Sequence, residues 1–368
     1  MNTRIIKMEE DNIDREAIDR AGIVIKNGGL VAFPTETVYG LGGDALNGAS
    51  SEKIYAAKGR PSDNPLIVHI ARMEALARIA EQIPEQALRL AEKCWPGPLT
   101  MIFHKKECVP PETTGGLSTV AVRMPSNKIA RALIEASGGY IAAPSANRSG
   151  RPSPTVAKYV IEDLDGRVDV IIDGGAAEIG LESTIVDFTE EKPVILRPGY
   201  ITAERLSEII DYSDAASAGR LGDNSHNVLD GSGEKQKACE KVEGAPKAPG
   251  MKYRHYAPKG SLTVVEGEDF RQVAAFINER LLQAKAAGKK TGVIAADETV
   301  GCYLADSVKN AGKRKEEAEI AKSLFRILRE FDDEKIQVIY AESFDSRGVG
   351  QAIMNRLLKA AGNKVIHL

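Results

Sequence analysis

The sequence contains few cysteines and few aromatic residues. Its 368 residues include four cysteines, and only 5% are aromatic. The cysteines (Cys94, Cys108, Cys239 and Cys302) lie far apart, with no CxxC pair and no Cys/His spacing typical of zinc sites. This distribution argues against a disulfide framework or a structural zinc site, and it is ordinary for a protein in a reducing compartment.

Net charge and long apolar segments are also lacking. The 49 Lys and Arg residues nearly balance 52 Asp and Glu residues, giving a formal charge of -3. No net field therefore draws the protein to nucleic acid or an anionic membrane, and any nucleic-acid contact must be local. The N-terminus MNTRIIKMEEDNIDRE lacks the apolar core of a signal peptide, and no run of about 18 apolar residues occurs. We expect a cytoplasmic protein.

The length and the apolar pattern predict two α/β domains. A length of 368 residues is about twice that of a typical domain of roughly 150 residues. Short apolar runs alternate with helical patterns over residues 1–210, which predicts a mixed sheet. Residues 211–260 are rich in Gly, Ala and Ser and are typical of a linker. In residues 261–368, three strand-like and three helical segments alternate, which predicts a small doubly wound domain.

Common catalytic motifs are missing or incomplete. The segment Gly40 to Ala45 matches G-x-G-x-x-A, a form of the dinucleotide fingerprint. That fingerprint requires a strand directly before it, whereas Pro34 to Thr37 interrupts the strand here, so we expect these glycines to serve tight packing. The P-loop, G-x-S-x-G and H-E-x-x-H patterns do not occur. Covalent hydrolase and zinc-protease chemistry therefore lose support.

A set of cations and small polar groups lies where apolar runs meet loops in the first domain. Arginine forks and lysine amines suit phosphate and carboxylate, so this set indicates an anion site. The alternative is that each charge is an ordinary solvated residue. By the same reasoning, His69 could be a core histidine, and Trp95 is expected to be a packing anchor. The set comprises Lys58, Arg60, Arg123, Arg148, Arg151, Arg197, Thr35, Thr37, Asn64, Ser145, Asn147, Ser153 and Ser183.

An ordered series of motifs resembles the YrdC-like family of threonylcarbamoyl-AMP synthases. PTETVYGLG, NPLIVHI, WPGPLT, VAVRMP, PSAN, ESTIVD and ILRPG follow one another over residues 1 to about 210. APGMKYRHYAP (248–258) and GVGQAIMNRLLKA (348–360) resemble the linker and the end of the extra domain in the family's long version. The resemblance implies a YrdC-like twisted mixed sheet with helices over 1–210, a linker or lid over 211–260, and a smaller Rossmann-like parallel α/β domain over 261–368.

The resemblance also implies an activity. L-threonine, bicarbonate and ATP would become threonylcarbamoyl-adenylate and pyrophosphate, with Mg²⁺ present, which makes the protein a nucleotidyltransferase. The product would pass to a transferase that modifies tRNA next to the anticodon. Attack of N-carboxy-threonine on the α-phosphate needs positioning and charge neutralisation rather than a protein nucleophile. The missing Ser-His and Cys-His sets are consistent with that chemistry.

By position, the resemblance assigns roles to individual residues. It implies a catalytic tetrad of Lys58, Arg60, Ser145 and Asn147. It implies a threonine pocket of Thr37, His69, Arg123, Ala143 and Ser183, with Ala143 contributing its backbone. It implies ATP contacts from Lys58, Arg60, Asn64, Thr119, Ser145, Asn147, Ser153, Arg197 and, as a lid, Tyr253. Glu182 and Asp187 are candidate Mg²⁺ ligands.

Two other functions remain open from the sequence. The first is a double-stranded RNA-binding or tRNA-binding translation factor, against which the charge balance and the scarcity of stacking aromatics weigh. The second is a carbamoyl-transfer domain like that of hydrogenase maturation proteins, whose extra zinc-finger and acylphosphatase segments are missing here. Pyrophosphate release with ATP, bicarbonate and each amino acid in turn would separate the three.

Overall fold

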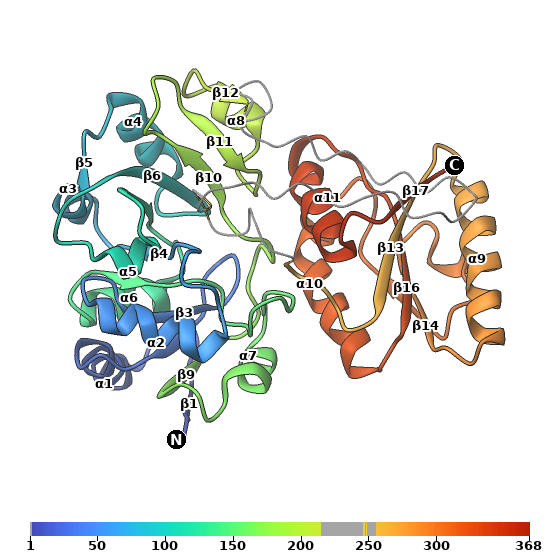
Figure 1. Ribbon diagram of the computed structural model, residues 1–368, viewed down its shortest axis with the longest axis horizontal. Helices are drawn as coiled ribbons and strands as arrows, with labels where there is room; N and C mark the ends of the chain where they lie inside the picture. The colour runs from blue at the N-terminus through green and yellow to red at the C-terminus, as the bar shows by residue number, and fades with distance from the viewer. Residues whose placement is uncertain (1, 215–245, 247, 249–254) are drawn as a thin grey trace. The chain divides into compact units, whose positions relative to one another are not determined.

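The chain forms two compact units, each with its own sheet (Figure 1). The computed structural model describes residues 2–214, 246, 248 and 255–368. Of these, residues 2–149, 153–214, 246 and 248 belong to the first unit, and residues 150–152 and 255–368 belong to the second. The predicted lid residue Tyr253 and most of the predicted linker lie outside the described residues.

The first unit contains twelve strands around which helices pack. The strands are β1 (Arg4–Lys7), β2 (Val31–Phe33), β3 (Gly40–Asp44), β4 (Ile67–His69), β5 (Ala80–Glu81), β6 (Leu99–Lys105), β7 (Thr119–Arg123), β8 (Ile141–Ala142), β9 (Val170–Asp173), β10 (Thr184–Asp187), β11 (Val194–Arg197) and β12 (Ser213–Asp214). The helices are α1 (Arg15–Lys26), α2 (Gly48–Lys58), α3 (Leu76–Ile79), α4 (Glu85–Cys94), α5 (Pro111–Thr114), α6 (Lys128–Ala136), α7 (Ala157–Leu164) and α8 (Ala203–Ser207).

The strands of the first unit form one mixed sheet, as the sequence predicts. Their order is β1-β9-β2-β3-β8-β4-β7-β6-β10-β11-β12, and β5 pairs with β6. The sheet contains both parallel pairs, such as β4 with β7, and antiparallel pairs, such as β6 with β7. α1 and α6 bury their apolar residues together in one cluster, while α2, α4 and α7 contribute to a second, larger cluster. Trp95 lies in that larger cluster and donates its indole N–H to Leu99 O at 2.7 Å, which confirms it as a packing anchor.

The glycine-rich segment after Pro34 is a strand rather than a phosphate-binding turn. β3 pairs antiparallel with β2 and β8, and its first four residues are buried. A Cβ on Gly42 would lie 2.7 Å from Ile141 Cγ2 and 2.9 Å from Phe33 Cε1. The fingerprint match at Gly40 to Ala45 therefore reflects close packing between strands, as expected from the sequence.

The second unit is a five-stranded parallel sheet between helices, which confirms the predicted parallel α/β architecture. Its elements are β13 (Ser261–Glu266), α9 (Phe270–Ala286), β14 (Thr291–Ala295), β15 (Ser307–Asn310), α10 (Glu317–Asp333), β16 (Val338–Glu342), α11 (Gly348–Ala361) and β17 (Val365–His367). The strand order is β15-β14-β16-β13-β17, and every pair is parallel. α9 covers one face, and α10 and α11 cover the other (Figure 1). The sequence did not predict the edge strands β15 and β17.

Among the described residues, no helix combines the length and the apolar character needed to span a bilayer.

Candidate active site

Many predicted site residues gather on one face of the first sheet. Alternate residues of a strand share a face, so Thr119 and Arg123 lie on the same face of β7, roughly 13 Å apart. The register pairs Arg123 with His69 of β4 and with Thr100 of β6. Ser183 directly precedes β10, whose first residue pairs with the first residue of β6. This face therefore offers polar groups from four neighbouring strands.

A cluster of buried apolar residues lies on the same face. It includes Ala248, from the segment that resembles the linker of the family's long version. The cluster consists of Ile67, Ile102, Ala121, Ile185, Val194, Leu196 and Ala248. Ala248 opens the segment APGMKYRHYAP and is fully buried in this cluster. The described start of that motif thus packs on the site face of the first unit.

The turn between β2 and β3 presents Thr37 through a local hydrogen-bond network. Thr35 Oγ1 accepts from the main-chain N–H groups of Thr37 at 3.2 Å and Val38 at 3.3 Å, and it donates to Val38 O at 2.6 Å. The Thr35 and Thr37 hydroxyls are 2.9 Å apart. Because the Thr35 proton goes to Val38 O, Thr37 donates to Thr35 and keeps only acceptor capacity for a ligand.

α2 places Lys58 and Arg60 at its C-terminal end. Asn47 caps the start of the helix by accepting from Ala49 N, and Gly59 ends it with a φ of 62°, in the left-handed region. Arg60 then donates from Nε to Asn64 O at 3.2 Å and from Nη2 to Pro65 O at 3.1 Å. The loop 60–65 therefore fixes the Arg60 guanidinium by its main chain.

Three of the four tetrad residues are joined directly. Lys58, which is 3% exposed, donates from Nζ to the main-chain carbonyls of Ser145 and Asn147. The Ser145 hydroxyl donates to Asn147 Oδ1. Ser149 N also donates to Lys58 O at 2.9 Å. The structure thus brings together Lys58, Ser145 and Asn147, with Arg60 two residues beyond Lys58.

The residues predicted to bind the substrate threonine include one partner of a buried ion pair. Arg123 Nη2 lies 2.7 Å from Glu36 Oε1, and both side chains are about 5% exposed or less. Ala143 is held by its N–H, which donates to Ile67 O at 2.8 Å. His69 neighbours Arg123 across β4 and β7. The structure therefore brings His69 and Arg123 together, and it adds Glu36, which the sequence reasoning missed.

His69 is held in its neutral form. Burial, together with the positive charge of Arg123, lowers the pKa of His69 to about 3. Its Nδ1 lies 3.1 Å from Ile67 O, which favours the tautomer with the proton on Nδ1. Because the ring is neutral, His69 of β4 adds no charge beside the ion pair of Arg123 and Glu36.

Ser183 and Arg197 form a second polar group at the start of β10. Arg197 donates from Nε to Ser183 O and from Nη2 to Ser183 Oγ, both at 3.1 Å. Thr100 Oγ1 lies 2.7 Å from Ser183 Oγ. Ser153 donates to Glu182 Oε1 at 2.7 Å, and both residues are buried. Ser183 is a predicted contact of threonine, and Ser153 and Arg197 are predicted contacts of ATP. The hydrogen bonds to Glu182 and Ser183 therefore bring these three residues to one loop.

Some sequence candidates lie apart from these groups. Arg148 is exposed. Arg151 belongs to the second unit, where Nη2 lies 3.7 Å from Asp332 Oδ2. Asp187 accepts from the main-chain N–H and the hydroxyl of Thr189 with Oδ1, so it caps the turn after β10.

The comparisons with known proteins cover the whole chain. The Sua5/YciO/YrdC family model, described as telomere recombination, matches residues 23–199, and the model of the threonylcarbamoyl-AMP synthase C-terminal domain matches residues 201–362. The threonylcarbamoyl-AMP synthase of Pyrococcus abyssi is 48% identical over 99% of each chain, and that of Bacillus subtilis is 45% identical over 95% of this chain and 94% of its own. The chain belongs to the threonylcarbamoyl-AMP synthase family.

Solved structures agree with this membership. The structure of Pyrococcus abyssi Sua5 complexed with L-threonine matches 100% of both chains with a TM-score of 0.87 and 46% identity. The family resemblance, the YrdC-like fold with its extra parallel domain, and the nucleotidyltransferase class of enzyme predicted from the sequence are thereby confirmed.

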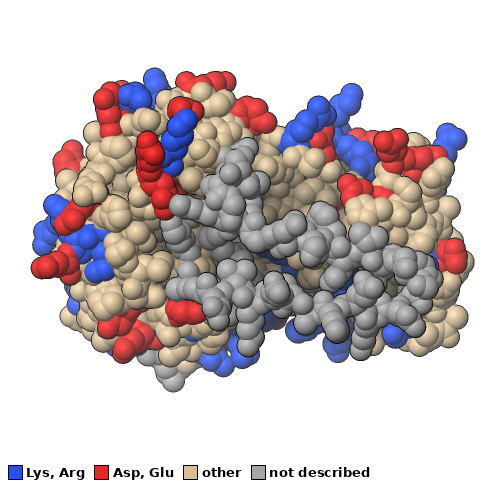
Figure 2. All heavy atoms as spheres, turned by 45° about the horizontal axis from the view of Figure 1, so that its top comes forward, with Lys and Arg blue, Asp and Glu red and all other residues tan. Residues whose placement is uncertain are grey.

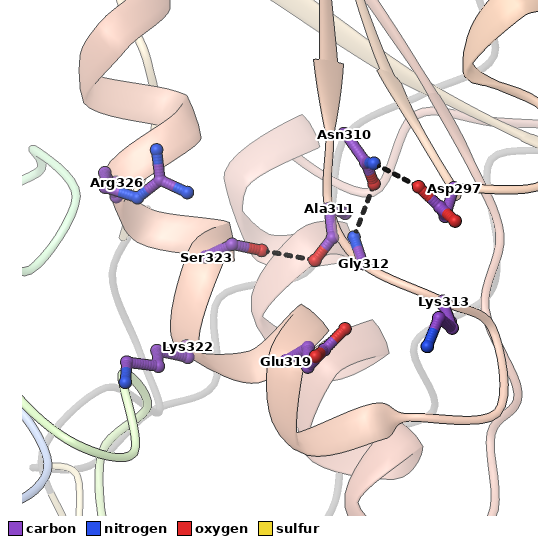
Figure 3. Close-up of a pocket in the computed structure, with 9 residues that line it drawn as sticks. All are labelled: Asp297, Asn310, Ala311, Gly312, Lys313, Glu319, Lys322, Ser323 and Arg326. Atoms are coloured by element: carbon purple, nitrogen blue, oxygen red, sulfur yellow. Dashed lines mark hydrogen bonds between the residues drawn. The ribbon is translucent and has the colours of Figure 1, made fainter.

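The second unit of this synthase-family chain has a separate pocket of about 520 Å³ (Figure 3). It lies between α10 and the ends of β14 and β15. Asn310 donates to Asp297 at 2.6 Å, and Ser323 donates to Ala311 O at 2.6 Å. Arg326 pairs with Glu330 at 2.6 Å. None of the residues predicted from the sequence lines this pocket, so the candidate active site is the face of the first sheet.

Sequence reasoning missed Glu36 and Thr100 although both lie in motifs it used. Glu36 stands between Thr35 and Thr37 in PTETVYGLG, and Thr100 ends WPGPLT. An acidic residue in a loop ordinarily predicts solvent exposure. Only the pairing with Arg123, which is distant in sequence, reveals that Glu36 is buried.

Proposed function

We propose that this protein makes threonylcarbamoyl-AMP and pyrophosphate from L-threonine, bicarbonate and ATP. The observation that carries the proposal is the joining of Lys58 to the Ser145–Asn147 loop, in a first unit that also holds the buried group around Arg123. This arrangement supplies one site for phosphate oxygens and one for an amino acid. Relatives that share 45–48% of their residues over nearly the full chain carry the name of this activity.

The reaction requires these residues to orient two substrates rather than to form a covalent bond. The threonine amine and bicarbonate first combine, with loss of water, to give the carbamate N-carboxy-threonine. A carbamate oxygen then attacks the α-phosphorus of ATP, and the bond from that phosphorus to the bridging oxygen breaks as pyrophosphate leaves. Lys58, Arg60 and Arg197 would bind phosphate oxygens and neutralise the charge that grows on them. Ser145, Asn147, Asn64, Thr119 and Ser153 are the proposed polar contacts to ATP. Thr37, His69, Arg123, Ala143 and Ser183 are the proposed threonine contacts.

We propose that Mg²⁺ accompanies ATP. Mg²⁺ is commonly bound through one or two carboxylates together with substrate phosphates and water. The described residues contain no cluster of three His, Cys, Asp or Glu side chains. Glu182 fits the smaller requirement, because its buried carboxylate accepts from Ser153, a proposed ATP contact. We therefore assign Glu182 as the side chain that would hold the ion, which when bound would neutralise phosphate charge.

Pyrophosphate release tests the proposal. We expect release only when L-threonine, bicarbonate and ATP are all present. Serine lacks one methyl group, which is worth about 1–3 kcal/mol in a fitted pocket, so it should react roughly 10- to 200-fold less well. Equal release without threonine would overturn the proposal. Detection of threonylcarbamoyl-AMP by mass spectrometry identifies the product.

The product would pass to a tRNA-modifying transferase, since a mixed anhydride of this kind is an activated acyl donor. Direct RNA binding has less support. On the face shown in Figure 2, Lys and Arg side chains are interspersed with Asp and Glu on both units. The nearly balanced totals of 49 Lys and Arg and 52 Asp and Glu also give no net attraction to RNA.

A further inference from the structure

Glu36 has no role in the proposed contacts, yet it pairs with Arg123. We propose that Glu36 is a specificity-determining residue for the amino-acid substrate. One of its carboxylate oxygens holds Arg123, and the other accepts the side-chain hydroxyl of the substrate. This inference rests on the proposed function, because it assigns the recognition of threonine at that same site.

Each partner of the ion pair has one buried polar atom that makes no hydrogen bond within the described part of the chain. Glu36 Oε1 lies 2.7 Å from Arg123 Nη2, and both residues are 4% exposed. Glu36 Oε2 and Arg123 Nε are buried and have no hydrogen-bond partner among the described residues. A buried charged group ordinarily satisfies all its polar atoms. The pair therefore offers one acceptor and one donor for a bound molecule.

The main chain fixes the position of Glu36. Its carbonyl accepts from Ile179 N at 2.8 Å, and the next carbonyl, of Thr37, accepts from Gly180 N at 3.1 Å. On the other side, the Thr35 hydroxyl network closes the turn. A carboxylate on a turn anchored from both sides can serve as a directional acceptor.

The free donor and acceptor match the two ends of a hydroxy-amino acid. The substrate carboxylate requires a cationic donor, which Arg123 Nε provides. The substrate amine is the group that becomes a carbamate, and a carbamate carries negative charge. A carboxylate beside that charge would repel it, so Glu36 Oε2 is left for the side-chain hydroxyl. A hydrogen bond from a hydroxyl to a carboxylate is also stronger than one to a neutral acceptor.

Two neutral acceptors compete for the same hydroxyl. Thr37 Oγ1 has free lone pairs, and neutral His69 has one on Nε2. Neither of them leaves a buried charge unsatisfied if the hydroxyl is missing. Only Glu36 therefore imposes a large penalty on valine, in which a methyl group replaces the hydroxyl.

The test compares L-threonine with L-valine and L-allo-threonine. Rates of pyrophosphate release give kcat/KM for each amino acid, and calorimetry gives affinity without turnover. We expect Glu36→Gln to lower the threonine-to-valine ratio of kcat/KM at least tenfold and to lower discrimination against L-allo-threonine, while the KM for ATP changes less than twofold. A purely structural role would reduce the rates with all three amino acids alike.

Matched variants keep the result decisive. Glu342 of the second unit is 1% exposed and pairs with Arg314, so Glu342→Gln removes an equally buried carboxylate and should leave the ratio unchanged. If Glu36→Gln does not fold, Glu36→Asp retains the charge, and its shorter side chain should still lower the ratio at least fivefold. The assignment is overturned if folded Glu36 variants keep the wild-type threonine-to-valine ratio of kcat/KM. It is also overturned if Thr37→Val lowers that ratio and the Glu36 variants do not. A wild-type protein that releases no pyrophosphate with threonine instead overturns the proposed function.

Discussion

At the scale of single residues, the two cations of the proposed tetrad are held by main-chain carbonyls. Lys58 bonds the carbonyls of Ser145 and Asn147, and Arg60 bonds those of Asn64 and Pro65. Groups held in place in advance lose little reorganisation energy during the reaction. The same contacts also give Lys58 a structural role, which the sequence motif alone does not show.

Removing either cation should therefore reduce turnover, and removing Lys58 should also reduce stability. We expect Lys58→Ala and Arg60→Ala each to reduce turnover roughly 100-fold or more, because loss of one preorganised charge costs about 3 kcal/mol. Lys58→Ala should also lower the free energy of unfolding by about 1–3 kcal/mol, since two buried carbonyls lose their donor. Steady-state kinetics and chemical denaturation measure the two effects. Lys53→Ala on the same helix is the control and should keep full turnover.

The neutral His69 predicts a pH dependence of stability. Its folded pKa of about 3 lies below the usual unfolded value of roughly 6.5, so the unfolded chain binds more protons between these values. The stability that His69 contributes is complete above pH 6.5 and is lost as the pH falls toward 3. Between pH 7 and pH 5 the loss should be about 2 kcal/mol.

Urea unfolding of wild type and His69→Gln at several pH values measures this contribution. The variant should lose about 2 kcal/mol less than wild type over that range. Parallel curves for the two proteins would show that His69 does not titrate on unfolding.

At the scale of elements, the sequence predicts strands well where apolar residues dominate and poorly where glycine does. The apolar run from Leu99 to Phe103 covers most of β6, and the run from Thr184 to Phe188 includes all of β10. β3 escaped prediction because four of its residues are Gly, Leu, Gly and Gly, which carry no alternating pattern. The site loops were found from their motifs, whereas the partner of Arg123 depends on register and turn geometry that no local pattern encodes.

β3 should tolerate no added side chain at its centre. Gly42→Ala would place a methyl group within 2.7 Å of Ile141 and 2.9 Å of Phe33. Forcing an extra carbon into a packed core costs about 1–3 kcal/mol, so the melting temperature should fall clearly. Gly301→Ala serves as the control, since a Cβ there meets nothing within 4 Å. Equal melting temperatures for the two variants would contradict the close approach of β2, β3 and β8.

At the scale of the whole molecule, each unit has its own hydrophobic core. The cluster that contains Leu41 and Val122 lies in the first unit, and the cluster that contains Val293 and Ile277 lies in the second. Units with separate cores can open separately.

Two glycine variants test this separation. Gly42→Ala strains the first core, and Gly292→Ala would bring a methyl group within 2.7 Å of Phe331 in the second. Hydrogen exchange should accelerate over residues 2–214 in the first variant and over residues 261–368 in the second. Acceleration of both regions in both variants would show that the units unfold as one.

The pairing of Glu36 with Arg123 has a consequence for how the two substrates respond to ionic strength. The buried pair and the neutral His69 together carry no net charge. Free threonine is a zwitterion with no net charge either. Dissolved salt should therefore screen little of the attraction between threonine and this group of residues. ATP carries several negative charges and its proposed contacts Lys58, Arg60 and Arg197 are cations, so raising the salt concentration should weaken ATP binding. Raising the salt concentration should therefore lower the affinity for ATP while the affinity for threonine changes little.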